Sequence, residues 1–584
     1  MLRIDAFFRQ TRANLQQGLA FWGGELRSLT SQEIRILESQ NNLCENWGQL
    51  QVSTDFTPLR IAGNRFEGRV VLGRLETPCG LFRSTLIEAE VGPGTTIDQN
   101  SFLRRCWIEG PSTVLNSRVD CTQASSFGLG RKILVGPETG GRWIPTSDDL
   151  SLESAQVKVN SPQALQAAED LAQSIKSPFS YVGPNCFLVN LGQADGVFLA
   201  GNVEVRGCAQ IENSFVTAEP ENPACLGAGV CLRSCLVQAG VHLDTFALAE
   251  NSVFLEFSGG SDHVRLSESM IGPNTHLSSG EVHSCFLGPF VGMHHQSLLI
   301  SCWWPQGRGN LGYGANVGSN HTSRAPDQEI RPGEGMFFGL DCAVKFPADF
   351  SESPYSLVAT GVVTESQRME LPFSLLLEGS GNQQPAPGLT RVIPGWVLAE
   401  NFYMVWRNET KFQKRNRLST SSWDLRVLRP EIVDKLWKAR EALAERAGKE
   451  VYTQQDICVI GRNYLLESDR KKAVLTYHNF TLYSALRFFA EKTYRIRDYD
   501  PAWLQGLFQR LGLDFSDRIG LLKAFLAHET ALWESARASK QKDDRRGAQI
   551  FDDWEQFWPR GAEDEVLLAK EKELQEWKVR ILGN

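Results

Sequence analysis

The feature that most constrains this chain is an aliphatic residue that returns every six positions. Between these residues lie short runs rich in Gly, Pro, Asn, Ser and Thr, as in VGPGTT and MIGPNTHL. The spacing excludes an α-helix, whose apolar face recurs at three and four residues. It also excludes an ordinary hairpin sheet, which needs strict alternation along longer strands. The residues that keep the spacing are Val91, Ile97 and Leu103; Val237, Leu243, Ala249 and Leu255; Ile271, Leu277 and His283; and Leu287, Met293 and Leu299.

This repeat predicts a mainly β solenoid, in which short parallel strands and tight turns stack coil upon coil. Each repeated residue should point inward, so we expect Val91, Ile97, Leu243, Ile271 and Met293 to be almost completely buried. The repeat resembles the hexapeptide repeat of left-handed β-helix proteins. Most of these are acyltransferases or the acyl- or sugar-binding ends of nucleotidyltransferases. The resemblance implies a left-handed parallel β-helix without identifying a reaction.

The loss and return of the repeat divide the chain into five regions. Near the N-terminus, Thr30 and Glu33 form a capping-box pattern before an apolar run, which predicts a helix. A β-helix has unpaired backbone at both ends, so both terminal regions are expected to act as caps. The predicted regions are an N-terminal helical cap at 1–60, β-helix at 61–130, a helix-containing insertion that leaves the coil stack at 131–180, further β-helix at 181–375, and an α-helical C-terminal domain at 390–584.

Composition narrows the functional classes. The formal net charge is −8 over 584 residues, which favours neither nucleic acid nor an anionic membrane as a partner. No apolar run of about 18 residues predicts a membrane-spanning helix, and the first residues lack the pattern of a secretory signal. The 13 cysteines include no C-x-x-C pair and are interpreted as small apolar fillers. We therefore expect a cytoplasmic protein.

The densest group of candidate functional residues lies between positions 301 and 347. His321 could accept a proton near pH 7, because the pKa of imidazole lies close to neutrality. Arg308 and Arg324 could each hold a phosphate or carboxylate through two hydrogen bonds. A nearby carboxylate could orient the imidazole. The predicted site comprises catalytic His321 and binding residues Arg308, Arg324, Asp327, Glu329, Trp303 and Trp304.

Three other groups of polar residues have both a functional and an ordinary structural interpretation. His276, His283, His294 and His295 fall on neighbouring coils but lack the spacing of zinc-binding β-helix carbonic anhydrases, so no metal site is predicted. His283 falls on the inward repeat, where it is interpreted as a core group. Arg142 follows two glycines and could help to bind an anion, or simply lie at a flexible entry to the insertion. Arg407, Lys411 and Lys414 share one face of a predicted helix, which could meet a phosphate or be a solvated basic face.

The run NVGSNHTSRAPDQEIRPGEGMFFGLDCAVKFPADFSESPYSLVATGVV is similar to a bacterial family defined only as a domain of unknown function. Some members of that family are labelled UDP-N-acetylglucosamine pyrophosphorylase-related. The order of His321, the APDQE segment and TGVV also resembles hexapeptide-repeat acetyltransferases. A pyrophosphorylase needs a Rossmann-like domain with a Gly-rich loop, and no such pattern precedes the repeat. The label therefore reflects the shared β-helix, and fold does not imply function.

The preferred hypothesis is an acyltransferase that acts on a sugar or sugar nucleotide, with His321 as general base and an acyl-CoA or acyl carrier as donor. One alternative is a non-catalytic oligomeric binding or scaffold protein that contacts a protein partner through its C-terminal helical domain. Another is a nucleotidyltransferase relative that binds a sugar nucleotide without the catalytic Rossmann-like domain. In each case we expect a homo-oligomer, with a trimer as the predicted assembly because β-helix sides pack in this way within the superfamily.

Overall fold

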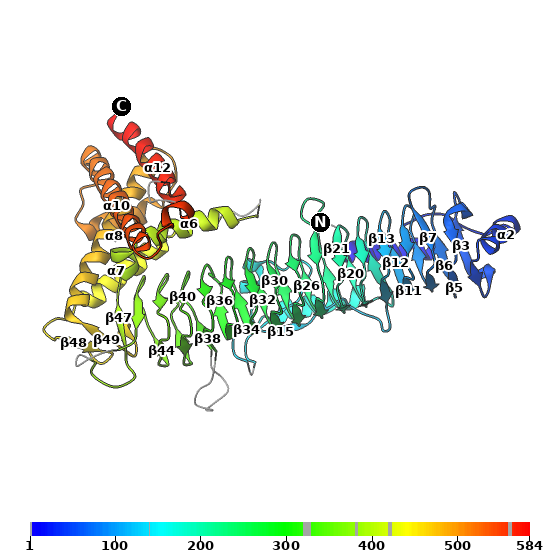
Figure 1. Ribbon diagram of the computed structural model, residues 1–584, viewed down its shortest axis with the longest axis horizontal. Coiled ribbons are helices and arrows are strands. Elements are labelled where there is room, and N and C mark those ends of the chain that lie inside the picture. Colours follow the sequence, from blue (N-terminus) through cyan, green and yellow to red (C-terminus); the bar gives the residue numbers. More distant parts are fainter. Residues whose placement is uncertain are drawn as a thin grey trace. The chain divides into compact units, whose positions relative to one another are not determined.

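The computed structural model describes residues 3–138, 140–318, 329–379, 384–418, 423–558 and 563–583. It contains two compact units, Met1–Ile330 and Arg331–Asn584. Figure 1 shows stacked β-coils in both and a group of helices in the second. Within the described ranges, no helix is long and apolar enough to cross a membrane.

Each coil of the first unit contributes short strands that line up into three faces. Strand β31 (Arg265–Ser267) lies on face 1, β32 (Met270–Ile271) on face 2 and β33 (His276–Ser278) on face 3. The longer β34 (Glu281–Leu287) runs around the corner and pairs with both β31 and β32. The strands of the preceding coil, all parallel to their successors, are β28 (Leu248–Glu250), β29 (Val253–Phe254) and β30 (Gly259–Ser261).

The predicted inward residues form the core of this β-helix. Val91, Ile97, Leu243, Ile271 and Met293 are all 0% exposed, which confirms the parallel β-helix predicted from the six-residue spacing. Such burial explains the fold energetically, because each aliphatic side chain removed from water contributes about 1.5–3 kcal/mol.

His283 is the exception, and its assignment to the inward row was wrong. The buried residue of that coil is Val282, and His283 is 27% exposed. The reason is the length of the coil. Val282 lies opposite Leu266, 16 residues earlier, whereas Leu266 lies opposite Ala249, 17 residues earlier. The shorter coil shifts the phase by one residue and turns the imidazole outward on face 1.

Face 2 is apolar on its outer side as well as its inner side. The helix α1 (Ile4–Gln16) covers part of it, with the rings of Phe7 and Tyr181 centred 4.3 Å apart. Phe21 stacks on Trp107 at 5.6 Å. The outward side chains are at most 5% exposed and comprise Trp107, Tyr181, Phe198, Phe215, Leu236, Val253, Met270 and Phe286.

The insertion leaves the parallel ladder, since β12 (Cys106–Ile108) pairs directly with β17 (Ser180–Val182), and it then packs back against the coils. It contains the antiparallel pair β15 (Lys132–Leu134) and β16 (Trp143–Pro145), followed by α3 (Leu152–Lys158) and α4 (Pro162–Ile175). Its backbone is bonded to successive coils: Leu134 N donates to the Glu268 carboxylate at 2.9 Å and Gly136 N donates to Ser284 O at 2.8 Å.

The N-terminal end of the β-helix closes with a helix and an antiparallel strand. Thr30 and Glu33 form the predicted capping box at the start of α2 (Ser31–Ser39). Strand β1 (Leu26–Ser28) pairs antiparallel with β3 (Leu50–Ser53) in the first coils. This pairing interrupts the repeating parallel ladder and satisfies backbone groups that would otherwise be open at the edge.

The second unit ends its coils in a related way. Strand β46 (Leu375–Leu377) continues the parallel ladder and pairs antiparallel with β47 (Thr390–Ile393). The predicted helical region follows. In α8 (Glu467–Thr493), the Tyr477 hydroxyl donates to Pro372 O at 2.6 Å, which joins this helix to the last coils. The C-terminal helices therefore cover the end of the stack, as expected.

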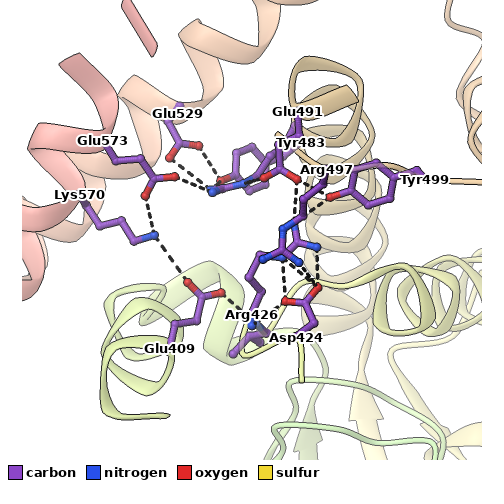
Figure 2. A network of polar contacts seen from close by, with 12 residues as sticks. Glu409, Asp424, Arg426, Tyr483, Glu491, Arg497, Tyr499, Glu529, Lys570 and Glu573 are labelled. Carbon is purple, nitrogen blue, oxygen red and sulfur yellow. Dashed lines mark hydrogen bonds and ion pairs between the residues drawn. The ribbon is translucent and has the colours of Figure 1, made fainter. Parts of the chain in front are cut away.

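A buried network of charged residues joins the C-terminal helices (Figure 2). Arg487 of α8 donates to Glu491 at 3.0 Å and to Glu573 of α12 (Glu565–Leu582) at 2.6 Å, and lies 3.6 Å from Glu529 of α10 (Arg518–Ala548). Burial raises the pKa of Glu529, although Arg487 opposes this. The network thus fixes the contacts between three long helices by specific polar pairing.

Candidate functional site

Three of the predicted site residues, His321, Arg324 and Asp327, lie outside the described residues, so their roles stay predictions. Arg308 lies in a turn with φ 62°, where its backbone N–H donates to Pro289 O. Trp304 is completely buried, which places its indole in the core rather than at a binding surface.

The structure brings Trp303 and Glu329 together through a residue of the insertion. Arg142 donates to the two carboxylate oxygens of Glu329 at 2.5 and 3.0 Å, and its guanidinium lies 4.6 Å from the centre of the Trp303 ring. Gly136, at φ +80°, lies against this pair, and a Cβ atom there would come within 2.7 Å of both partners. Arg142 therefore has a carboxylate of the chain itself as its partner and holds the insertion to the coils.

His283 lies between two polar partners on face 1. The Ser267 hydroxyl is 2.6 Å from Nδ1, and Glu138 Oε1 is 3.5 Å from Nε2. Ser267 and His283 are opposite residues of β31 and β34, while Glu138 comes from the insertion. The negative charge of Glu138 favours the tautomer with its proton on Nε2, which leaves Nδ1 to accept the hydroxyl proton of Ser267.

Ser267 lines a surface hollow of about 330 Å³ together with Cys231, Arg233, Leu248 and Glu250. A second hollow, of about 640 Å³, crosses the neighbouring coils. Both are bordered by Arg265, which is exposed and forms no side-chain hydrogen bond or ion pair with any described residue. An arginine in this state offers two N–H groups to a ligand carboxylate or phosphate.

An aromatic pair lies at one corner of the second hollow. Phe246 stacks on His263, with ring centroids 5.4 Å apart and an interplanar angle of 11°. Phe246 is 54% exposed, and His263 lines the hollow. The pair offers a flat apolar surface close to Arg265. Face 1 thus combines a nucleophile, a base, a cation and an aromatic surface, which we call the face-1 site (Glu138, Phe246, His263, Arg265, Ser267 and His283).

The order Ser267, His283, Glu138 matches nucleophile, base and orienting carboxylate in acyl-transfer enzymes. The sequence prediction missed Ser267, Glu138 and Arg265. A signal was present, because Ser267 and His283 are 16 residues apart and stack in a coil of that length. The contribution of Glu138 could not be found in this way, since the insertion breaks the repeat.

The histidines do not form a metal centre among the described side chains. No group of three or more His, Cys, Asp or Glu residues in those ranges could hold a metal ion. His276 lies on face 3 and His283 on face 1, so the two imidazoles belong to different faces of the same coils.

Three comparisons place the chain among known proteins. The family model described as "Domain of unknown function (DUF4954)" matches residues 26–447. An uncharacterized protein of Treponema pallidum (strain Nichols) is 25% identical over 471 residues, and the match spans 74% of this chain and 64% of that protein. A crystal structure from Desulfovibrio desulfuricans G20, provisionally described as an acetyltransferase, is 9% identical and covers 64% of this chain and 77% of that one. Its TM-score of 0.11 carries no structural argument.

Proposed function

The chain belongs to the family described as Domain of unknown function (DUF4954), and we propose that this member transfers an acyl group to a hydroxyl of a sugar or sugar nucleotide through Ser267. The observation that carries the proposal is the 2.6 Å contact between Ser267 Oγ and His283 Nδ1, with Glu138 on the other side of the imidazole. All residues of the face-1 site lie within the part of the chain that the family model matches.

The reaction begins with attack of Ser267 Oγ on the carbonyl carbon of an acyl thioester, as the hydroxyl proton moves to His283 Nδ1. The carbon–sulfur bond then breaks, and the imidazolium returns the proton to the leaving thiolate. An acyl ester on Ser267 and a free thiol result. In the second half, the acceptor hydroxyl attacks this ester and gives its proton to His283. The proton passes to Ser267 Oγ as the serine–acyl bond breaks, which releases the O-acylated acceptor.

The surroundings of Ser267 support a small acceptor that carries an anionic group. Arg265 lies two residues before Ser267 in β31, so both side chains leave the same face of the strand. Its guanidinium can hold a phosphate or carboxylate, and the stacked Phe246 and His263 can pack against the apolar side of a sugar ring. An acyl-CoA or an acyl carrier is the proposed donor.

His321 remains an alternative base. In that mechanism the acceptor hydroxyl is deprotonated directly and attacks the thioester in one step, without a covalent intermediate. The two mechanisms predict different kinetics, because only the Ser267 route gives a rapid release of one thiol per chain and an acylated protein.

The test uses the full chain with acetyl-CoA as donor. The parent should release thiol in a burst, and mass spectrometry should find an acetyl group on Ser267. Ser267→Ala should abolish both, and His283→Ala should slow acylation by about 10²–10⁴-fold, the usual contribution of a general base. His276→Ala is the matched control on face 3 and should leave both unchanged. An acylation rate in Ser267→Ala equal to that of the parent would refute the proposal.

A second candidate is the non-catalytic binding protein, which is favoured by the shallow form of the two hollows. Enzyme sites for small molecules usually bury most of the ligand surface, and these hollows are open on face 1. In this case a sugar nucleotide should raise the melting temperature of the protein without turnover. Arg265→Gln should remove that shift, and Ser267→Ala should preserve it.

A further inference from the structure

The helix α6 (Tyr403–Arg415) carries three cations in a row along one face. Arg407, Lys411 and Arg415 follow one another at intervals of four residues, so they lie one above another with a rise of about 6 Å per step. The other side of the helix is buried, where it places Val405, Trp406 and Phe412 in the helical region. The row of cations lies on the opposite side, where Arg407 and Arg415 are exposed and Lys411 is partly buried.

The remaining charged groups of α6 are paired, unlike this row. Lys414 forms an ion pair with Glu565 at 2.5 Å. Glu409 accepts from Val427 N at 2.9 Å and lies 3.6 Å from Lys570. By contrast, the side chains of Arg407, Lys411 and Arg415 form no hydrogen bond or ion pair with any residue in the described part of the chain. Lys414 shares this face, as predicted from its spacing, but it is paired with Glu565, so the row without such a partner consists of Arg407, Lys411 and Arg415.

The cations of the row repel one another. Burial, together with the charges of Arg415 and Arg407, lowers the pKa of Lys411 to about 8. Burial and Arg407 likewise lower the pKa of Arg415. Cations in the last turn of a helix are favoured by its dipole, which accounts for Arg415 but not for Arg407 and Lys411. Like charges at this spacing destabilise a helix, so an anion between them would remove an unfavourable term.

We propose that Arg407, Lys411 and Arg415 form a binding site for a diphosphate group. A diphosphate carries several negative charges and enough acceptor oxygens to contact neighbouring members of the row at once. The planar arginines at the two ends can each donate two parallel N–H groups to one phosphate, and Lys411 in the middle adds a point charge. The site is independent of the face-1 site, which belongs to the other unit.

The test is titration calorimetry of the full chain with inorganic pyrophosphate and, in a second arm, with the nucleoside diphosphate UDP. Saturable binding of pyrophosphate is expected, with an affinity that falls as the salt concentration rises. Lys411→Gln, Arg407→Gln and Arg415→Gln should each weaken it by about tenfold or more, the loss expected for one charge-assisted contact. Lys438→Gln, which changes an exposed lysine of the neighbouring α7 (Pro430–Ala444), is the matched control and should bind as the parent does.

The two arms separate the sources of the diphosphate. Equal affinities for pyrophosphate and UDP would support a site that contacts the diphosphate alone, and tighter UDP binding would support a site for a nucleotide. The proposal is overturned if neither ligand binds, if Lys438→Gln weakens binding as much as Lys411→Gln, or if the row binds only oligonucleotides or anionic lipid vesicles. Circular dichroism of each variant should match the parent, so that loss of binding is not loss of fold.

Discussion

Arg142 and Glu329 form a two-pronged ion pair across 187 residues of sequence. The pair joins the loop between β15 and β16 to a coil of the β-helix, beside the ring of Trp303. Both side chains are mostly buried, at 18% and 12% exposure. A pair in this setting fixes a position in the fold more strongly than an exposed pair, since its partners cannot easily turn to water.

Replacing Arg142 by Ala should therefore destabilise the first unit by about 1–3 kcal/mol, the cost of leaving a buried polar group without its partner. Urea unfolding measures this loss, and hydrogen exchange should become faster in β15 and β16. Arg9→Ala is the control, because its pair with Asp5 is exposed and should contribute less than about 1 kcal/mol. Equal losses in the two variants would contradict the assigned role of Arg142.

Glu138 should matter for catalysis through His283 rather than by contact with the substrate. Glu138→Gln removes the charge that favours a proton on Nε2, so a larger share of the imidazole should carry its proton on Nδ1 and be unable to accept one from Ser267. We expect a lower kcat with little change in KM, and a loss smaller than the about 10²–10⁴-fold expected for His283→Ala. Steady-state kinetics with acetyl-CoA provide the measurement. A change confined to KM would show that Glu138 acts on binding instead.

The fold could be predicted from sequence because the six-residue spacing is a local property of each strand. The sequence prediction missed the burial of the outer side of face 2, although the sequence of these strands indicates it. Consecutive apolar residues occur on this face, as in Trp107-Ile108, Tyr181-Val182 and Phe198-Leu199. One member of each pair points inward and the other outward, which is the pattern of strands buried on both sides. The pair Trp303-Trp304 follows the same rule, so only Trp303 is partly exposed.

The site could be predicted only in part, for a different physical reason. The contact between Ser267 and His283 depends on the length of a single coil, and one missing residue moved the histidine from the core to the surface. Contacts from the insertion, through Glu138 and Arg142, depend on how a segment without a repeat crosses the coils. The position of the insertion on the coils cannot be predicted from a periodic pattern, because it depends on tertiary packing.

A trimer, as predicted, would need an exposed face of the β-helix as the interface between copies. Outward residues of face 2 from Trp107 to Phe286 are covered by α1 and the insertion, so in these coils another copy would have to contact face 1 or face 3. Light scattering at low micromolar concentration should give three times the mass of the chain. Ser261→Arg on face 3 and Arg233→Glu on face 1 should then identify the interface, because only one of them should lower the mass. The mass of a single chain for the parent protein would refute the prediction.

Glu573 and Glu529, both labelled in Figure 2, lie beside Arg487 but should respond oppositely to pH. Burial raises the pKa of Glu573, yet Arg487 and Lys570 outweigh burial and hold it at about 2. A carboxyl whose pKa is lowered by folding stabilises the folded state above its unfolded value of 4.5, and this contribution is lost as the pH falls toward 2. Each unit of pKa difference is worth about 1.36 kcal/mol, so lowering the pKa of Glu573 from 4.5 to about 2 stabilises the folded state at pH 7 by about 3 kcal/mol.

The contribution of Glu529 to stability has the opposite pH dependence, because burial raises the pKa of this carboxyl. Its contribution is present at low pH and is lost as the pH rises above 4.5 toward its folded value. Glu573→Gln should therefore destabilise the helical region strongly at pH 7 and much less at pH 3, whereas Glu529→Gln should be nearly neutral or stabilising at pH 7. Urea unfolding of the full chain at both pH values, followed by hydrogen exchange in α8, α10 and α12, distinguishes the two variants. Equal destabilisation by both at pH 7 would show that Arg487 needs all of its carboxylates ionised.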